Sequence, residues 1–172
     1  IAKKIAEAYG VKMIDVLTGF KFIGEQIGFL EDKGEENRYI FGFEESYGYL
    51  AGSYVRDKDA VVASMLICEM AAFYRTKGIS LLQARENMYA KYGVYKHSQQ
   101  SFTCEGASGM ERMKEIMSDL RIKTPEEIGG LKVTRFDDYL ASVSLDTATN
   151  DKTMLTLPKS DVLAFMLTDG AS

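Results

Sequence analysis

The sequence predicts an α/β fold in two parts: a layered αβα domain over residues 1–93 and a truncated α+β domain over residues 94–172. Helical and strand-like segments alternate through the first part, which is typical of a sheet covered by helices. Gly93 ends the last helical pattern of that part, and a polar stretch with scattered β-formers follows it. The chain has 172 residues and can therefore bury one good core or two small ones.

The composition is that of an ordinary globular protein, with 46% hydrophobic and 27% charged residues. It excludes disordered and low-complexity architectures. No apolar run reaches the roughly 18 residues of a membrane span, and no export signal is visible, so we expect a cytoplasmic protein without a membrane partner. The net charge of −4 leaves no basic surplus for phosphates, so we expect no nucleic-acid partner.

The elements of the first domain are expected in the order α-β-α-β-α-α. An amphipathic helix at the start of the chain ends at Gly10, and alternate apolar residues over 11–17 indicate a short strand. Thr18 is expected to cap a helix over residues 20–30. Tyr, Ile and Phe residues over 38–43 indicate a second strand.

Two more helices complete this domain. Asp57 or Asp59 can cap a helix over residues 60–77. That helix is apolar nearly all round, which predicts a central packed helix with Cys68 as a buried thiol. Ser80 is expected to cap the last helix, which ends just before the domain boundary.

The second domain mixes strands with one helix. A polar strand is expected over residues 94–105, where His97 is a surface residue, and an amphipathic helix over 108–121 is expected to pack its methionines in the core. Short strands are expected over 131–133 and 162–167. The chain begins without Met inside a helical pattern and ends on a turn signal after its last strand. We therefore expect it to be a piece of a longer protein.

Three polar clusters lie where loops meet apolar elements. Residues 18–21 place a hydroxyl, a glycine and a cation at a helix N-terminus, which suits an anion or a sugar hydroxyl, although a plain helix cap explains them too. Residues 44–46 end a strand with two carboxylates and a serine that can bind sugar hydroxyls, the alternative being a solvated strand end. In residues 56–59, Lys58 can meet a phosphate, or the run is simply a cap.

Together these clusters resemble a known family. The segments that carry the resemblance are Thr18-Gly19-Phe20-Lys21-Phe22-Ile23-Gly24, Gly42-Phe43-Glu44-Glu45-Ser46-Tyr47-Gly48-Tyr49 and Arg56-Asp57-Lys58-Asp59. They are similar to the third domain of the α-D-phosphohexomutases, the phosphoglucomutase and phosphomannomutase family. Residues 128–133 and 157–163 are similar to the opening parts of the fourth domain. The middle motif resembles most the bacterial phosphoglucomutases and the phosphopentomutase-like branch.

The resemblance implies a function and a set of substrate contacts. The parent enzyme would interconvert hexose 1-phosphate and hexose 6-phosphate through a phosphoserine. Carried over residue by residue, Glu44 and Ser46 would bind the sugar hydroxyls, Thr18 and Gly19 would line the substrate site, and Lys58 would approach the substrate phosphate.

Other parts of the family's machinery have no counterpart in this sequence: the phosphorylated serine, the triple-aspartate magnesium loop and the late phosphate loop. The resemblance therefore implies that Mg²⁺ and the activator glucose 1,6-bisphosphate act on the full-length enzyme, that its missing domains are partners of this chain, and that the chain alone is inactive. No catalytic residue or metal ligand is assigned here. A stand-alone, non-catalytic sugar-phosphate-binding module and a phosphopentomutase fragment stay open as alternatives, as does the choice among glucose, mannose and pentose phosphates.

Overall fold

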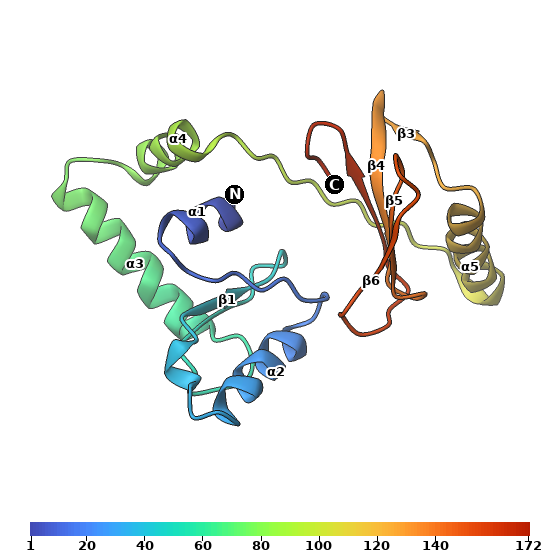
Figure 1. Ribbon diagram of the computed structural model, residues 1–172. Helices are drawn as coiled ribbons and strands as arrows, with labels where there is room; N and C mark the ends of the chain where they lie inside the picture. Colours follow the sequence, from blue (N-terminus) through green and yellow to red (C-terminus); the bar gives the residue numbers. More distant parts are fainter. The chain divides into compact units, whose positions relative to one another are not determined.

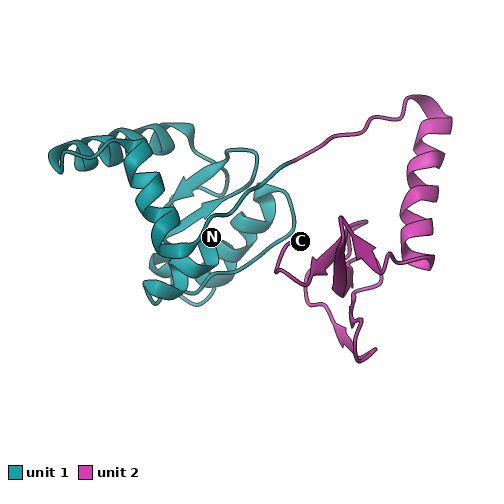
Figure 2. Cartoon of the chain, turned by 90° about the horizontal axis from the view of Figure 1, so that it is seen from above, with its two compact units in different colours: residues 1–98 teal, residues 99–172 magenta.

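The computed structural model describes all residues from Ile1 to Ser172 and divides into two compact units (Figure 2). The first unit is Ile1–Ser98 and the second is Gln99–Ser172. The division falls a few residues after the boundary expected at 93/94. None of the helices is both long enough and apolar enough to cross a membrane.

The first unit consists of helices around a short β-hairpin (Figure 1). Its elements are α1 (Ala2–Ala8), α2 (Phe20–Glu31), the 3-10 helix η1 (Glu36–Arg38), β1 (Phe41–Phe43), β2 (Tyr49–Ala51), α3 (Ala60–Thr76) and α4 (Leu81–Tyr92). Strands β1 and β2 are antiparallel, with Phe43 opposite Tyr49. The α/β character predicted from the sequence is confirmed.

Side-chain caps set where two of these helices begin. The Asp59 carboxylate accepts hydrogen bonds from the backbone N–H groups of Val61 and Val62, at 2.7 and 3.2 Å, and so starts α3. The Ser80 hydroxyl accepts a hydrogen bond from the backbone N–H of Gln83 at 3.1 Å and starts α4. Both caps satisfy backbone donors that have no partner within the helix. Ser80 was predicted, and of the two candidates for α3, Asp57 and Asp59, the structure uses Asp59.

Two predicted strands of the first unit are corrected. Residues 11–17 form no regular secondary structure, and the strand expected over 38–43 begins only at Phe41. A strand forms only where a neighbouring strand pairs with its backbone. Here β2 pairs with Phe41–Phe43 and with no residue before Phe41. Residues 44–48 consequently form the turn of a hairpin and do not lie at the edge of a parallel sheet.

Helix α3 is also not the packed central helix that was expected. None of its residues is buried, Val61 and Met65 are 71% and 65% exposed, and the thiol expected to be buried, Cys68, is exposed. Its main neighbours in this chain are β2 and α4. The apolar composition predicts a helix that can be buried, but it does not predict which other element would cover it.

The core of the first unit lies between α2 and the hairpin. Its members are Phe20, Ile23 and Ile27 of α2 and Leu50 of β2, with Val16 and Tyr39 packed against them. Ile27 and Leu50 are completely buried. Tyr39 donates a hydrogen bond to the Leu50 carbonyl at 3.3 Å, and burial raises its pKa to about 12. This packing holds the start of α2 beside the end of β1.

The second unit is an antiparallel sheet preceded by one helix. Its elements are α5 (Gly106–Ile122), β3 (Glu127–Ile128), β4 (Leu131–Asp138), β5 (Val143–Asp146), β6 (Lys152–Met154) and β7 (Leu163–Leu167). Strand β4 pairs with β3, β5 and β7, so the strands expected at 131–133 and 162–167 are confirmed. The rings of Phe136 of β4 and Phe165 of β7 pack in a tilted arrangement with their centres 5.2 Å apart.

Two expectations for this unit are wrong. Residues 94–105 form no strand, since no neighbour pairs with them. The methionines of α5 do not pack in a core, and Met110 is 64% exposed. The amphipathic pattern located the helix correctly, because it depends only on residues within the helix, whereas burial depends on other elements.

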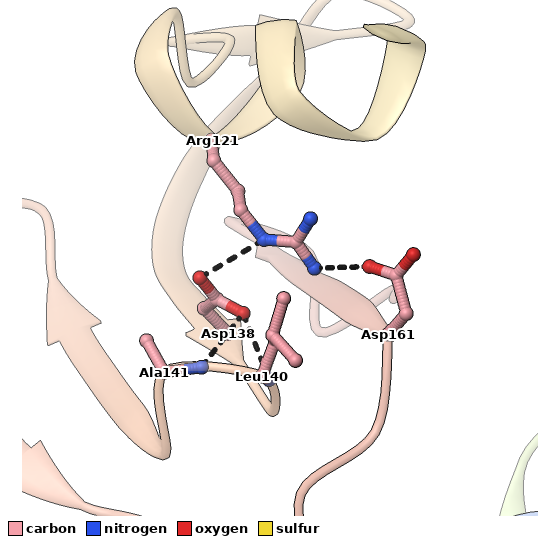
Figure 3. Close-up of polar contacts among 5 residues, drawn as sticks. All are labelled: Arg121, Asp138, Leu140, Ala141 and Asp161. Atoms are coloured by element: carbon pink, nitrogen blue, oxygen red, sulfur yellow. Dashed lines mark hydrogen bonds and ion pairs between the residues drawn. The ribbon is translucent and has the colours of Figure 1, made fainter. Parts of the chain in front are cut away.

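Arg121, in the last turn of α5, ties this helix to the sheet (Figure 3). Its Nε donates to Asp138 Oδ2 at 3.1 Å and its Nη2 donates to Asp161 Oδ1. The other oxygen of Asp138 accepts from the backbone N–H groups of Leu140 and Ala141, at 3.0 and 3.3 Å. The pKa of Arg121 is raised, first by the hydrogen bond to Asp161 and then by that to Asp138. One carboxylate thus fixes both the β4–β5 turn and the helix.

Arg121→Met is expected to lower the free energy of unfolding of the second unit by about 1–2 kcal/mol, because it leaves Asp138 without its cation. The Asp138 side chain is only 11% exposed, so water replaces the lost donor poorly. The control is Arg112→Met, which removes an exposed pair with Glu115 on the same helix and should cost less than about 0.5 kcal/mol. Urea unfolding followed by circular dichroism compares the two variants, and equal losses would contradict the role given to Arg121.

Candidate functional site

Segments from two of the three polar clusters meet at one small pocket of the first unit. The lining residues are Val16, Leu17, Thr18, Gly19, Ile23, Phe43, Glu44 and Glu45. The pocket therefore lies between the start of α2 and the end of β1. Its volume of about 80 Å³ is well below the roughly 300–1,000 Å³ of sites that enclose a whole ligand, so the pocket can hold only a small part of one.

The hairpin turn places Glu44 at its base and Ser46 near its tip. The backbone N–H of Glu44 donates to the Gly48 carbonyl at 3.0 Å, and that of Tyr47 donates to the Glu44 carbonyl at 3.3 Å. Tyr47 has a φ of 66°, the left-handed conformation that closes three-residue hairpin loops. The Glu44 side chain is 12% exposed, whereas Glu45 and Ser46 are exposed. The two neighbouring carboxylates thus have different surroundings.

The third cluster reaches the same place through Lys58. Its Nζ lies 4.0 Å from Glu44 Oε1 and 3.1 Å from Asp57 Oδ1. It also lies 5.5 Å from the centre of the Phe20 ring, at the start of α2. The structure therefore places an ammonium group beside the most enclosed carboxylate of the site.

Gly48 leaves room for this pair. A Cβ at this position would lie 2.7 Å from Glu44 Oε1 and 2.9 Å from the Lys58 Cδ, closer than packed atoms allow. The side chains of Glu44 and Lys58 thus pack directly against the Gly48 backbone. Gly48 and Phe20 both belong to the motifs that carry the family resemblance, but no role in the site was predicted for either of them.

The predicted site residues are placed as follows. Thr18, Gly19 and Glu44 line the pocket, and Lys58 lies next to Glu44. Ser46 is exposed on the turn and does not line the pocket. The expectation that Thr18 caps α2 is wrong: Gly19, with a φ of 120° that favours glycine, is the N-cap, and no side chain caps this helix. The binding roles of these residues stay predictions.

The arrangement suits recognition of hydroxyl and phosphate groups. A carboxylate accepts hydrogen bonds from hydroxyls, and an ammonium attracts a phosphate. No group of three or more His, Cys, Asp or Glu side chains is placed so that it could hold a metal ion. His97 is exposed, as expected for a surface residue.

A second, more open hollow lies along one face of α3. Its lining residues are Ala60, Val61, Ser64, Met65, Cys68 and Glu69. All six belong to one helix, and no cation lines the hollow. The small pocket at Glu44 is therefore the better candidate, since separate segments bring polar groups together there.

Gly48→Ala in the full-length protein is expected to weaken substrate binding, because the added methyl displaces the Glu44 and Lys58 side chains. We expect about a tenfold rise in KM for the substrate, since one displaced charge-assisted contact has about that effect. Gly28→Ala is the matched control: it lies in α2, and its Cβ would meet no atom within 4 Å. Steady-state kinetics and thermal unfolding distinguish the two, and an unchanged KM in Gly48→Ala would contradict the packing described.

Comparisons with known proteins identify the family of this chain. Residues 1–92 match the family described as "Phosphoglucomutase/phosphomannomutase, alpha/beta/alpha domain III". The chain therefore belongs to the phosphoglucomutase/phosphomannomutase family, which confirms the resemblance noted in the sequence.

Individual relatives are phosphoglucomutases of staphylococci. The chain is 35% identical to that of Staphylococcus epidermidis over 170 residues, which is 99% of this chain and 31% of the relative. It is 37% identical to that of Staphylococcus aureus over 170 residues, or 99% of this chain and 30% of the relative. The chain thus spans about a third of the length of the curated relatives it matches. No solved structure matches it.

Proposed function

We propose that this chain is the sugar-binding part of a phosphoglucomutase that interconverts glucose 1-phosphate and glucose 6-phosphate. The observation that carries the proposal is that Glu44 lines one pocket with Thr18 and Gly19 and has Lys58 next to it, in a chain with phosphoglucomutase relatives along 99% of its length. We also propose that the full-length enzyme is cytoplasmic.

Each residue has a role in this proposal. Glu44 accepts hydrogen bonds from sugar hydroxyls, and Ser46 adds a neutral hydroxyl contact from the turn. Lys58 binds the substrate phosphate, and Thr18 and Gly19 bound the site at the start of α2. A mutase holds its sugar in two orientations, and a carboxylate suits this because it accepts from hydroxyls in many directions.

The chemical step requires groups that this chain does not supply. Phosphoryl transfer depends on a positioned nucleophile and on metal charge. We therefore propose that the phosphoserine, the magnesium ligands and the contacts to glucose 1,6-bisphosphate lie in the enzyme's other domains, which are the partners of this chain.

A mutase assay on the full-length protein tests this function. Glucose, mannose and ribose 1-phosphates are supplied side by side with Mg²⁺ and the matching bisphosphate. We expect the highest kcat/KM with glucose 1-phosphate. A preference for mannose or ribose would assign the protein to the phosphomannomutase or phosphopentomutase alternative, and binding without turnover would favour a non-catalytic module.

The isolated 172-residue chain is expected to show no turnover of glucose 1-phosphate, with or without Mg²⁺ and glucose 1,6-bisphosphate. The reason is that the proposal places the phosphoserine, which gives a phosphoryl group to the sugar and takes one back, outside this chain. A coupled assay for glucose 6-phosphate measures this, with the full-length enzyme as positive control. Activity that co-purifies with the chain would show that the nucleophile is within it.

A further inference from the structure

The loop that carries Lys58 is closed by a hydrogen bond between two of its own side chains. The Tyr54 hydroxyl donates to Asp59 Oδ2. The other oxygen of Asp59 accepts from the backbone N–H groups of Val61 and Val62 at the start of α3. Both oxygens of one carboxylate are thus engaged, and Lys58 is the residue directly before it.

The same loop is anchored to the rest of the first unit. The backbone N–H of Asp59 donates to the Tyr49 carbonyl of β2 at 2.8 Å. Arg56 donates to Glu31, at the end of α2, at 2.6 Å. A Cβ on Gly24 of α2 would lie 2.5 Å from the Arg56 carbonyl oxygen, so helix and loop backbones are in close contact. The backbone around Lys58 is therefore fixed from several sides.

The Lys58 side chain itself is only loosely held. It is 51% exposed, its ion pair with Asp57 is exposed on both sides, and its ion pair with the enclosed Glu44 spans 4.0 Å, so these contacts restrain the side chain little. The direction in which the ammonium projects therefore depends on the backbone of the loop, and so on the bond between Tyr54 and Asp59.

The protonation states fit this bond. The hydrogen bond from Tyr54 is the largest cause that lowers the pKa of Asp59, with the Val62 and Val61 N–H groups adding to it, and the same bond raises the pKa of Tyr54. At neutral pH a protonated hydroxyl therefore donates to an anionic carboxylate, which is the stronger, charge-assisted kind of hydrogen bond.

We infer that Tyr54 is a positioning residue: its hydrogen bond to Asp59 sets the backbone from which Lys58 meets the phosphate of the sugar substrate. This inference rests on the proposed function, since it takes Lys58 as the phosphate contact. Fixing the loop before the substrate arrives reduces the ordering cost of binding. Tyr54 is itself exposed and outside the core, so its role is not packing.

A double-mutant cycle in the full-length enzyme tests this inference. The variants are Tyr54→Phe, Lys58→Met and their combination, and the matched control is Tyr9→Phe, an exposed tyrosine at the end of α1. Tyr54→Phe is expected to raise KM for glucose 1-phosphate about 3- to 10-fold, with kcat little changed, because it removes one hydrogen bond to a charged group. In the Lys58→Met background the same change should have almost no effect, because the two residues act as one unit.

Amide hydrogen exchange provides a readout other than activity. Tyr54→Phe should speed exchange at Lys58, Val61 and Val62, while Tyr9→Phe should not, and thermal midpoints should stay equal. If Lys58→Met leaves KM unchanged, the proposed role of Lys58 fails and this inference fails with it. If Lys58→Met raises KM but Tyr54→Phe does not, or if the two effects simply add, this inference alone is overturned.

Discussion

Glu44→Gln in the full-length enzyme is expected to lower kcat/KM for glucose 1-phosphate by about 10- to 100-fold, which corresponds to about 1.5–3 kcal/mol for a charge-assisted contact. Glutamine keeps the size of the side chain and one acceptor oxygen but loses the negative charge. Hydrogen bonds from sugar hydroxyls are therefore weakened. The nearby Lys58 ammonium, 4.0 Å away, also loses its enclosed counter-charge.

Two neighbours serve as controls for this prediction. Glu45→Gln should have a much smaller effect: Glu45 also lines the pocket, but its side chain is exposed and forms no ion pair with Lys58. Ser46→Ala should resemble Glu44→Gln in kind but cost only about 0.5–1.5 kcal/mol, since a neutral hydroxyl contact is weaker. A larger loss in Glu45→Gln, at equal thermal midpoints of all variants, would show that the sugar-binding role was given to the wrong carboxylate.

The helices of this chain were predictable because their signals are local. Asp59 and Ser80 each accept a hydrogen bond from a backbone N–H two or three residues away. The start of α3 and of α4 is therefore determined by a few adjacent residues. Strands depend on partners that local sequence does not describe. Residues 11–17 alternate like a strand yet pair with nothing, whereas β7 was predicted from its apolar run and pairs with β4.

The residues of the candidate site could be predicted from motifs, but their arrangement in space could not. The motifs named Glu44 and Lys58, and the fold of the first unit brings them to 4.0 Å. The residues that make this possible carry weak signals in sequence: Gly48 acts through the side chain it lacks, and Tyr54 acts through a hydrogen bond to Asp59. Contacts of this kind depend on the turn and the loop folding first.

The core that holds the site together should be sensitive to a single buried residue. Ile27→Ala is expected to lower the free energy of unfolding of the first unit by about 2–5 kcal/mol, because it leaves a cavity where little else can fill it. Ile27, on α2, is completely buried and belongs to the same core cluster as Leu50 of the hairpin. Ile23, one turn earlier, lines the pocket, so loosening α2 also loosens the site.

The matched control is the same substitution on α3. Ile67 is 52% exposed, so Ile67→Ala in the 172-residue chain should change the free energy of unfolding by less than about 0.5 kcal/mol. Urea unfolding followed by circular dichroism measures both variants, and equal losses would contradict the core described. Measuring Ile67→Ala in the full-length enzyme as well shows whether another part of the enzyme covers α3. If Ile67→Ala is costly there but not in the chain alone, another part of the enzyme covers α3; if it is harmless in both, this apolar helix stays open to solvent.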